Sequence, residues 1–362
     1  MSRDHKKHCS EIRNSRRGNG ACSVERHDKI RVAICVYGFP LAMNITVPYL
    51  NQNINNVVRN LSRSSMPPPA ADTFVALTTG PEVQERPGKG ESPVSPRMIN
   101  VRDALSDVLE LDPCRYEMID QDTWSLYENG RSIKIKEGPV AAENWLRNLY
   151  LLQRLQHLIR TQEKAKCFTY THVIVARADT ILPEPLGWRI PNEDAIVVPH
   201  FDVSGGRLLN DRFAYGNRSS MVDTYLAQYS RLGAHTTASG AAETFLCCLI
   251  KEQNTSVYTQ RIVVQRVRSS IENARGSEVS EKLRSEQQQL ASPSVAADLA
   301  RVYFRDIEGI KDPRQDPDCG HPICKKNLQS VCPESACIGS LSTGYSRRYP
   351  WQQMPGALER AV

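Results

Sequence analysis

Short apolar runs alternate with longer segments of helical periodicity between residues 30 and 268. Arg31-Val-Ala-Ile-Cys-Val-Tyr37 is a compact run with β-branched residues, which is typical of a buried strand. The segment from Met43 to Leu61 repeats apolar residues at helical spacing, and Asp72-Thr-Phe-Val-Ala-Leu-Thr78 predicts a second strand. Strand, helix and strand in this order form a βαβ unit, so we expect a mainly parallel sheet.

The same alternation continues toward residue 268 and completes the predicted fold. Thr171-His-Val-Ile-Val-Ala-Arg177 is apolar on both faces, which favours a fully buried strand. The longest helix is predicted from Ala141 to Thr161, where Trp145 and a series of leucines stripe one face. Further expected elements are helices near Val101 to Leu111, 218–232 and 240–252 and strands near Tyr116 to Ile119, Ala195 to Val198 and Ser256 to Val267. We therefore expect an α/β fold with a mainly parallel sheet flanked by helices.

The apolar periodicity stops on both sides of this predicted domain. Residues 1–29 are polar and rich in Lys and Arg, and residues 269–362 hold few large apolar side chains. Such composition does not offset the entropy of ordering, so both extensions are predicted to be disordered. The Lys- and Arg-rich arm at residues 1–29 raises the hypothesis that the protein binds nucleic acid. It lacks aromatic interleaving and zinc-finger spacing, so we expect no nucleic-acid partner.

Bulk composition narrows the class of protein further. The chain has 362 residues, of which 40% are hydrophobic, and its net charge is +6. No stretch approaches the ~20 apolar residues of a membrane helix, and the N-terminus lacks the pattern of a signal peptide. We expect no membrane span and a cytoplasmic location by default, with a secretory lumen as the alternative. Four N-glycosylation motifs matter only in that second case, and they begin at Asn44, Asn60, Asn217 and Asn254.

Nine of the eleven cysteines fall into two groups of different character. One group lies in or beside apolar elements, where a thiol is expected to behave as a small hydrophobe: Cys35, Cys114, Cys167, Cys247 and Cys248. The other group lies in the polar, Pro-rich tail: Cys319, Cys324, Cys332 and Cys337. The spacing of the tail cysteines leaves disulfides, a zinc site and free thiols open.

Polar chemistry is concentrated where the buried strand Thr171–Arg177 ends. In an open α/β sheet, ligands bind beyond the carboxyl ends of the strands. The carboxylate of Asp179 can hold a divalent metal through oxygen, and the guanidinium of Arg177 offers phosphate a bidentate fork. The alternative is a structural turn in which Arg177 only pairs with Asp179. In either case we expect Asp179→Asn to leave folding almost unchanged, because the sheet holds the backbone there.

The order of several motifs resembles that of glycosyltransferase-like proteins of the GT-A type. An opening strand ends in Gly38, a Trp-bearing helix follows, and the next strand ends in Arg177-Ala-Asp179. Asn210-Asp-Arg-Phe-Ala-Tyr-Gly216 comes next, then a Met-Tyr helix at 221–225 and a helix that opens with Glu243. The resemblance covers residues 30–268. It departs from the family pattern at Ala178, where Pro is frequent, and no strict Asp-x-Asp metal motif is present.

The resemblance implies a GT-A-like, Rossmann-related fold and transfer of a sugar from a nucleotide-sugar donor to a hydroxyl acceptor, for example on a glycan. It implies donor-binding roles for Gly38, Arg177 and Asp179, with Asp179 holding Mn²⁺ or Mg²⁺. It places Asp211 and Glu243 on the acceptor side, where either can act as general base. The retained acids favour an enzyme. The missing Asp-x-Asp motif favours a catalytically inactive glycan- or nucleotide-binding protein of the same fold.

Overall fold

The computed structural model describes the greater part of the predicted domain and one short segment beyond it. The described residues are 30–40, 43–61, 70–79, 101–120, 139–187, 193–199, 209, 211–232, 242–260, 262, 264–266 and 323–325. The predicted basic arm at 1–29 and nearly all of the predicted tail at 269–362 therefore lie outside the described residues, and their disorder remains a prediction.

The elements follow the predicted alternation of strands and helices closely. The first half of the chain forms β1 (Arg31–Gly38), α2 (Met43–Leu50), η2 (Asn51–Asn55), α3 (Asn56–Leu61), β2 (Ala70–Thr79), α4 (Val101–Glu110), β3 (Arg115–Asp120) and α5 (Pro139–Lys166). The second half forms β4 (His172–Arg177), β5 (Thr180–Ile181), β6 (Ala195–Pro199), β7 (Phe213–Asn217), α6 (Arg218–Ser220), η4 (Met221–Tyr225), α7 (Gln228–Arg231), α8 (Ala242–Glu252), β8 (Ser256–Gln260), β9 (Gln265–Arg266) and β10 (Ile323–Lys325).

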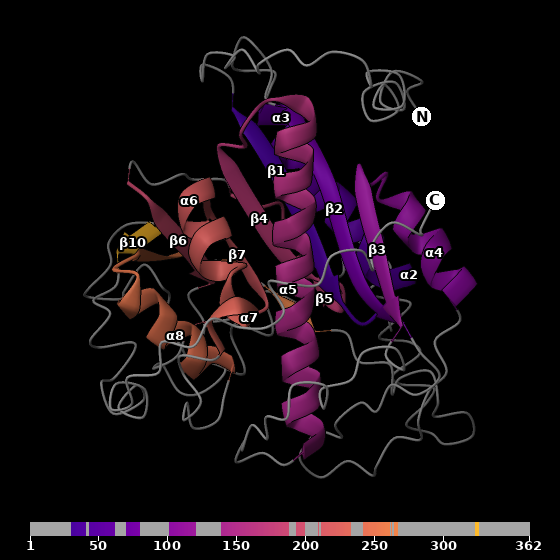
Figure 1. Ribbon diagram of the computed structural model, residues 1–362. Helices are drawn as coiled ribbons and strands as arrows, with labels where there is room; N and C mark the ends of the chain where they lie inside the picture. Colours follow the sequence, from indigo (N-terminus) through magenta and orange to yellow (C-terminus); the bar gives the residue numbers. More distant parts are fainter. Residues whose placement is uncertain are drawn as a thin grey trace, which may run out of the picture.

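A single sheet of eight strands, in the order β10-β8-β6-β7-β4-β1-β2-β3, organises the molecule (Figure 1). The run β3-β2-β1-β4 is parallel throughout, and β6 is parallel to β8. Strand β7 is antiparallel to both of its neighbours, β4 and β6. The predicted α/β fold with a mainly parallel sheet is confirmed.

Two hydrophobic clusters cover the two faces of this sheet, and β1 contributes to both. Ala33, Cys35 and Tyr37 belong to the cluster that includes α5, η4 and α8. The alternate residues of β1 belong to the cluster that includes α2, α3 and α4. Side chains of a strand point alternately to opposite faces, so the continuous apolar run of β1 is explained by its burial on both sides. In Figure 1, α5 crosses the front of the sheet and α2 lies behind it.

The segment predicted as one helix over 218–232 is interrupted. It begins as the short α6, continues as the wide turn η4 and ends in α7. In η4 the N–H of Leu226 donates to the carbonyl of Met221 at 2.8 Å, a bond that spans five residues instead of four. Such wide turns are frequent at functional sites. This one directs Tyr225 into the core, where its side chain is 0% exposed.

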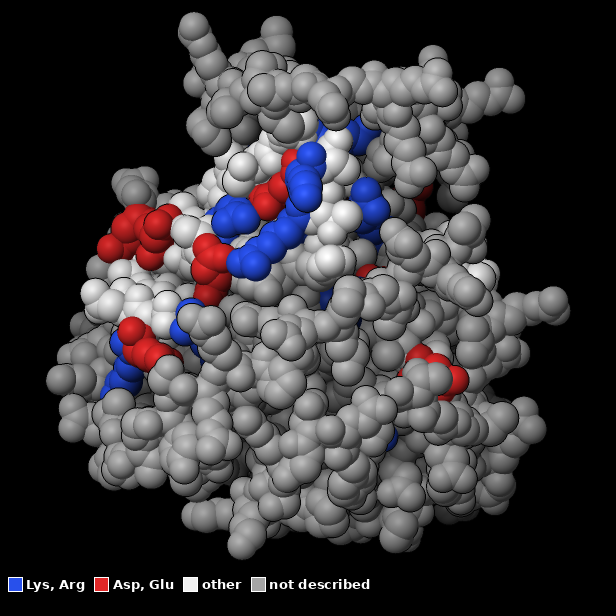
Figure 2. Space-filling model, in the orientation of Figure 1, with Lys and Arg blue, Asp and Glu red and all other residues white. Residues whose placement is uncertain are grey.

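Charged side chains on the α5 face are paired. Figure 2 shows basic and acidic side chains interleaved there. Arg218 forms a bidentate pair with Glu163, with distances of 3.0 Å from Nε to Oε1 and 2.9 Å from Nη2 to Oε2. Arg160 pairs with Asp223 at 2.9 Å, with both side chains about half exposed. The exposed pair contributes little to stability, whereas the Glu163 pair links α6 to α5.

No helix among the described residues combines the length and apolar character needed to span a bilayer. The segment predicted as a tail contributes one described element, because β10 pairs antiparallel with β8 through Cys324 and Thr259.

The cysteines of the domain include both thiols and disulfide-bonded residues. Cys35 and Cys114 are thiols outside any disulfide, and burial raises the pKa of the Cys35 thiol well above its ordinary value. Cys167, Cys247 and Cys248 are each part of a disulfide. The expected apolar burial therefore holds for Cys35, Cys247 and Cys248, but the expectation of a thiol is wrong for Cys167, Cys247 and Cys248. Local apolar context does not reveal whether a second cysteine approaches from a distant part of the chain.

Thiol labelling should report this division directly. When the unreduced chain is unfolded in denaturant with an alkylating reagent, we expect Cys35 and Cys114 to be labelled and the three disulfide cysteines to be protected. Prior reduction should expose all five. Mass spectrometry of the peptides gives the result, and alkylation of Cys247 or Cys248 without reduction would contradict the assignment.

Candidate functional site

The candidate site lies where the order of strands in the sheet reverses. The chain passes from β1 outward to β2 and β3, and then returns through α5 to place β4 on the other side of β1. In open α/β sheets, ligands bind at such a reversal, beyond the carboxyl ends of the strands. Here the carboxyl ends of β1 and β4 lie side by side, because Tyr37 and Arg177 are register partners. The N–H of Ala178 also donates to the carbonyl of Tyr37 at 2.7 Å.

Arg177 and Asp179 form a bidentate ion pair at this point. Nε of Arg177 lies 3.0 Å from Oδ1 of Asp179, and Nη2 lies 2.8 Å from Oδ2. Thr180 Oγ1 also donates to Oδ1, at 3.4 Å. The pair is almost removed from water, with side-chain exposures of 12% for Arg177 and 5% for Asp179. Burial alone would lower the pKa of the guanidinium, but the surrounding oxygens, with Asp179 first among them, raise it above its ordinary value.

This burial corrects the expectation for Asp179. Its turn follows the strand as predicted, but the side chain is not a surface group that Asn can replace without effect. A buried charge that loses its partner is strongly destabilising, so Asp179 contributes to folding as well as to the site. The sequence could not reveal this, because the depth of a turn depends on the elements packed around it.

Asp211 is held next to the pair by its backbone. Its carbonyl oxygen accepts one hydrogen bond from Tyr37 Oη at 2.9 Å and another from Tyr225 Oη at 2.8 Å. The following residue is also fixed, because the N–H of Arg177 donates to the carbonyl of Arg212 at 3.1 Å. Antiparallel pairing of β4 with β7 produces this proximity, since the end of one strand meets the start of the other. Asp211 thus connects β1 and η4, and Arg212 beside it connects to β4.

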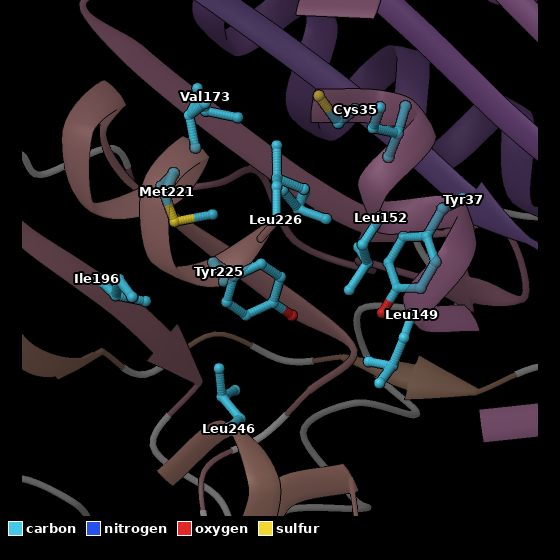
Figure 3. Packing of buried hydrophobic residues seen from close by; sticks show 14 of the residues in the cluster. Cys35, Tyr37, Leu149, Leu152, Val173, Ile196, Met221, Tyr225, Leu226 and Leu246 are labelled. Carbon is cyan, nitrogen blue, oxygen red and sulfur yellow. The ribbon is translucent and has the colours of Figure 1, made fainter. Parts of the chain in front are cut away.

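The two tyrosines that hold Asp211 are buried in the cluster on the α5 face. Tyr37 is 2% exposed and Tyr225 is 0% exposed, and Figure 3 shows their hydroxyls directed toward the space between the two rings. Burial is the main cause that raises the pKa of both phenols above the ordinary value, and the charge of Asp211 raises both further. Both hydroxyls therefore remain protonated at neutral pH and act as donors.

The Asp211 carboxylate differs from that of Asp179 in having no partner among the described residues. Asp211 is half-buried, and within the described part of the chain no hydrogen bond or ion pair involves its carboxylate. The adjacent guanidinium is also only partly used. Asp179 occupies Nε and Nη2, and no described residue accepts a hydrogen bond from Nη1 of Arg177. Among the described residues, the site thus offers the carboxylate of Asp211, whose backbone is held in place, and the Nη1 group of Arg177.

Gly38 ends β1 with a positive φ of 123°. A Cβ at this position would lie 3.8 Å from the nitrogen of Ala178, which is ordinary contact, so the requirement for glycine is conformational. We expect Gly38→Ala to lower the free energy of unfolding by about 1–3 kcal/mol through backbone strain. Thermal unfolding measures this, and an unchanged midpoint would show that the backbone relaxes at no cost.

Glu243 lies in the first turn of α8, but its side chain lies outside the part of the structure that is described. Two residues further on, Phe245 makes an edge contact with Trp145 of α5, with ring centroids 5.4 Å apart. This contact fixes the start of α8 against α5. The structure therefore joins Gly38, Arg177, Asp179 and Asp211 at one edge of the sheet, and their chemical roles remain predictions.

The predicted metal ligand does not fit the arrangement around Asp179. Both of its carboxylate oxygens face Arg177, and among the described residues no group of three His, Cys, Asp or Glu side chains could hold a metal ion. We therefore assign no metal to this carboxylate.

Sequence reasoning missed Tyr37 and Tyr225. A signal was present, because a tyrosine in an otherwise apolar buried element needs a partner for its hydroxyl. The partner itself, the carbonyl of Asp211, is 174 residues from Tyr37 and follows only from the sheet order.

Comparison with known proteins adds little to this geometry. No model of a known protein family matches the sequence, and no curated protein matches it. Similar solved structures include two crystal structures of the glycosyltransferase GlyE from Streptococcus pneumoniae TIGR4, one of them the apo form. Each has a TM-score of 0.34 and 10% sequence identity, with 77% of this chain covered. The matched region spans 64% of the length of the GlyE chain.

Proposed function

We propose that the protein is a glycosyltransferase that moves a sugar from a nucleotide-sugar donor to a hydroxyl acceptor. The observation that carries the proposal is the placement of Asp211 and Arg177 together at the reversal of strand order. A carboxylate and a guanidinium edge that no described residue occupies are the two groups that such a transfer needs. The order of motifs that resembles the GT-A type supports the same conclusion.

In this proposal Asp211 is the general base. The acceptor hydroxyl donates to its carboxylate, the hydroxyl oxygen forms a bond to the anomeric carbon, and the bond from that carbon to the diphosphate oxygen breaks. The proton passes to Asp211, and the sugar centre is inverted because attack and departure occur on opposite sides. General base catalysis of this kind contributes on the order of 10²–10⁴-fold in rate. Glu243 is the second candidate for the base.

Arg177 is the donor-binding residue, and Asp179 is its positioning residue. With Nε and Nη2 held by Asp179, the guanidinium plane is fixed and Nη1 can donate to the leaving diphosphate. Charge-assisted hydrogen bonds of this kind strengthen as negative charge develops on the leaving group. Asp179 thus acts through Arg177, which replaces the metal-ligand role expected from the sequence.

A catalytically inactive binding protein of the same fold is the second candidate. The pairing of Arg177 with Asp179 favours it, because Asp179 already neutralises the guanidinium and Asp211 adds a second acidic group, so the site offers no net positive charge to a diphosphate. Such a site suits a neutral glycan better than a bare nucleotide.

A donor-hydrolysis screen separates the two candidates. The full chain is incubated with a panel of nucleotide-sugars, once with Mn²⁺ and once with a chelator, and released nucleoside diphosphate is measured. The enzyme proposal expects release from one donor. Release that continues with chelator supports the role of Arg177, and release that requires Mn²⁺ contradicts a donor site that works without a metal. Binding of a donor or glycan without any release would establish the binding protein.

A further inference from the structure

The three disulfide cysteines are those expected of a chain in an oxidising compartment, which is also where its N-glycosylation motifs could be used. Cys167, Cys247 and Cys248 are each disulfide-bonded, and such bonds form and persist mainly in secretory and extracellular compartments. In those compartments an Asn-x-Ser/Thr motif can accept a glycan if its asparagine is accessible. Three of the four motifs have an asparagine whose exposure the structure describes.

Two of the motifs are poorly placed for a bulky modification. Asn44 is exposed but lies in α2, and the hydroxyl of its motif, on Thr46, is buried and donates to the carbonyl of Ala178 at 2.6 Å. Asn217 is half-buried, and its Oδ1 is shielded from solvent. The side chain of Asn60 lies outside the described residues.

Asn254 differs from both. It lies in the turn between α8 and β8, its side chain is exposed, and its φ is 49°. The N–H of Asn254 donates to the carbonyl of Lys251 at 3.1 Å, and the N–H of Thr255 donates to that of Ile250 at 3.0 Å. This pair of bonds is a Schellman motif, in which the residue after the helix is left-handed. The backbone of Asn254 is thus held by the cap, while the residue itself is exposed.

We propose that Asn254 carries an N-linked glycan. In the transfer, Nδ2 of Asn254 bonds to the anomeric carbon of an oligosaccharide carried on a lipid diphosphate, and the bond from that carbon to the diphosphate breaks. The electron pair of the broken bond stays on the lipid diphosphate, which leaves, and the proton lost by the amide passes to a base of the transferring enzyme. Ser256 supplies the hydroxyl of the motif. This modification is independent of the function proposed above for the strand-reversal site.

The alternative explanation for Asn254 is its conformation alone, since Asn is, after Gly, the residue most often found at this left-handed position. Two variants separate the explanations. Asn254→Gly keeps the cap and removes the acceptor amide. Ser256→Ala leaves Asn254 in place and removes the hydroxyl that the transferring enzyme requires, whereas Ser256→Thr keeps it.

The test is peptide mass spectrometry of the full chain isolated from the cells that make it, after enzymatic release of N-linked glycans, which converts a modified Asn to Asp. We expect conversion at position 254 in the wild-type chain and in Ser256→Thr. We expect one glycan fewer in Asn254→Gly and in Ser256→Ala. An unmodified Asn254 in the wild-type chain overturns the proposal, as does retention of the full glycan mass by both Asn254→Gly and Ser256→Ala.

Discussion

Replacing Asp179 by Asn is expected to lower the free energy of unfolding by about 3 kcal/mol, because it leaves the buried guanidinium of Arg177 without its carboxylate. In a domain of this size that loss corresponds to a fall of about 6–12 °C in the thermal midpoint. Thermal unfolding of the wild-type and variant chains at the same pH measures the effect. A midpoint within one degree of the wild type would show that water reaches the pair.

The double variant Arg177→Met/Asp179→Asn is the control for this loss. Removing both charges of a buried pair is far less costly than removing one, so we expect the double variant to recover most of the midpoint. The non-additivity of the two single variants measures the coupling between them. The double variant also separates folding from function. It should be stable and yet bind the donor poorly, because the guanidinium that contacts the diphosphate is gone.

Asp211→Asn is expected to reduce turnover on the order of 10²-fold or more, because the amide cannot accept the proton of the acceptor hydroxyl. Folding should change little, since the carboxylate has no described partner and the tyrosines bind the backbone carbonyl, which the substitution retains. Turnover and thermal midpoint are measured on one preparation. Asp223→Asn is the matched control, because Asp223 is a half-exposed acid paired on the surface, and its turnover should match the wild type. Wild-type turnover by Asp211→Asn would exclude Asp211 as the base.

The strands and helices could be predicted from the sequence because each element is encoded by its own local pattern. The predicted strand Arg31–Tyr37 is observed as Arg31–Gly38, and the predicted helix Ala141–Thr161 lies within the observed Pro139–Lys166. The predicted strand Ser256–Val267 is divided into β8 and β9, which belong to different sheets. A continuous β pattern does not specify where a strand changes partner.

The details of the site were less predictable, because they depend on contacts between distant parts of the chain. The sequence indicates that Arg177 and Asp179 follow a buried strand, but it does not show that they are buried themselves. The hydrogen bonds from Tyr37 and Tyr225 to Asp211 require β7 to be inserted antiparallel beside β4. That reversal of direction has no local signature in the sequence.

The central claim is that ligand binds at the carboxyl ends of β1 and β4, and hydrogen exchange tests it most directly. Deuterium uptake of the full chain is compared with and without the nucleotide-sugar selected by the donor screen. We expect slower exchange in peptides covering residues 36–40, 176–180 and 209–213, with no change in peptides of the α4 surface. Protection confined to other peptides, with these three segments unchanged under saturating ligand, would contradict it.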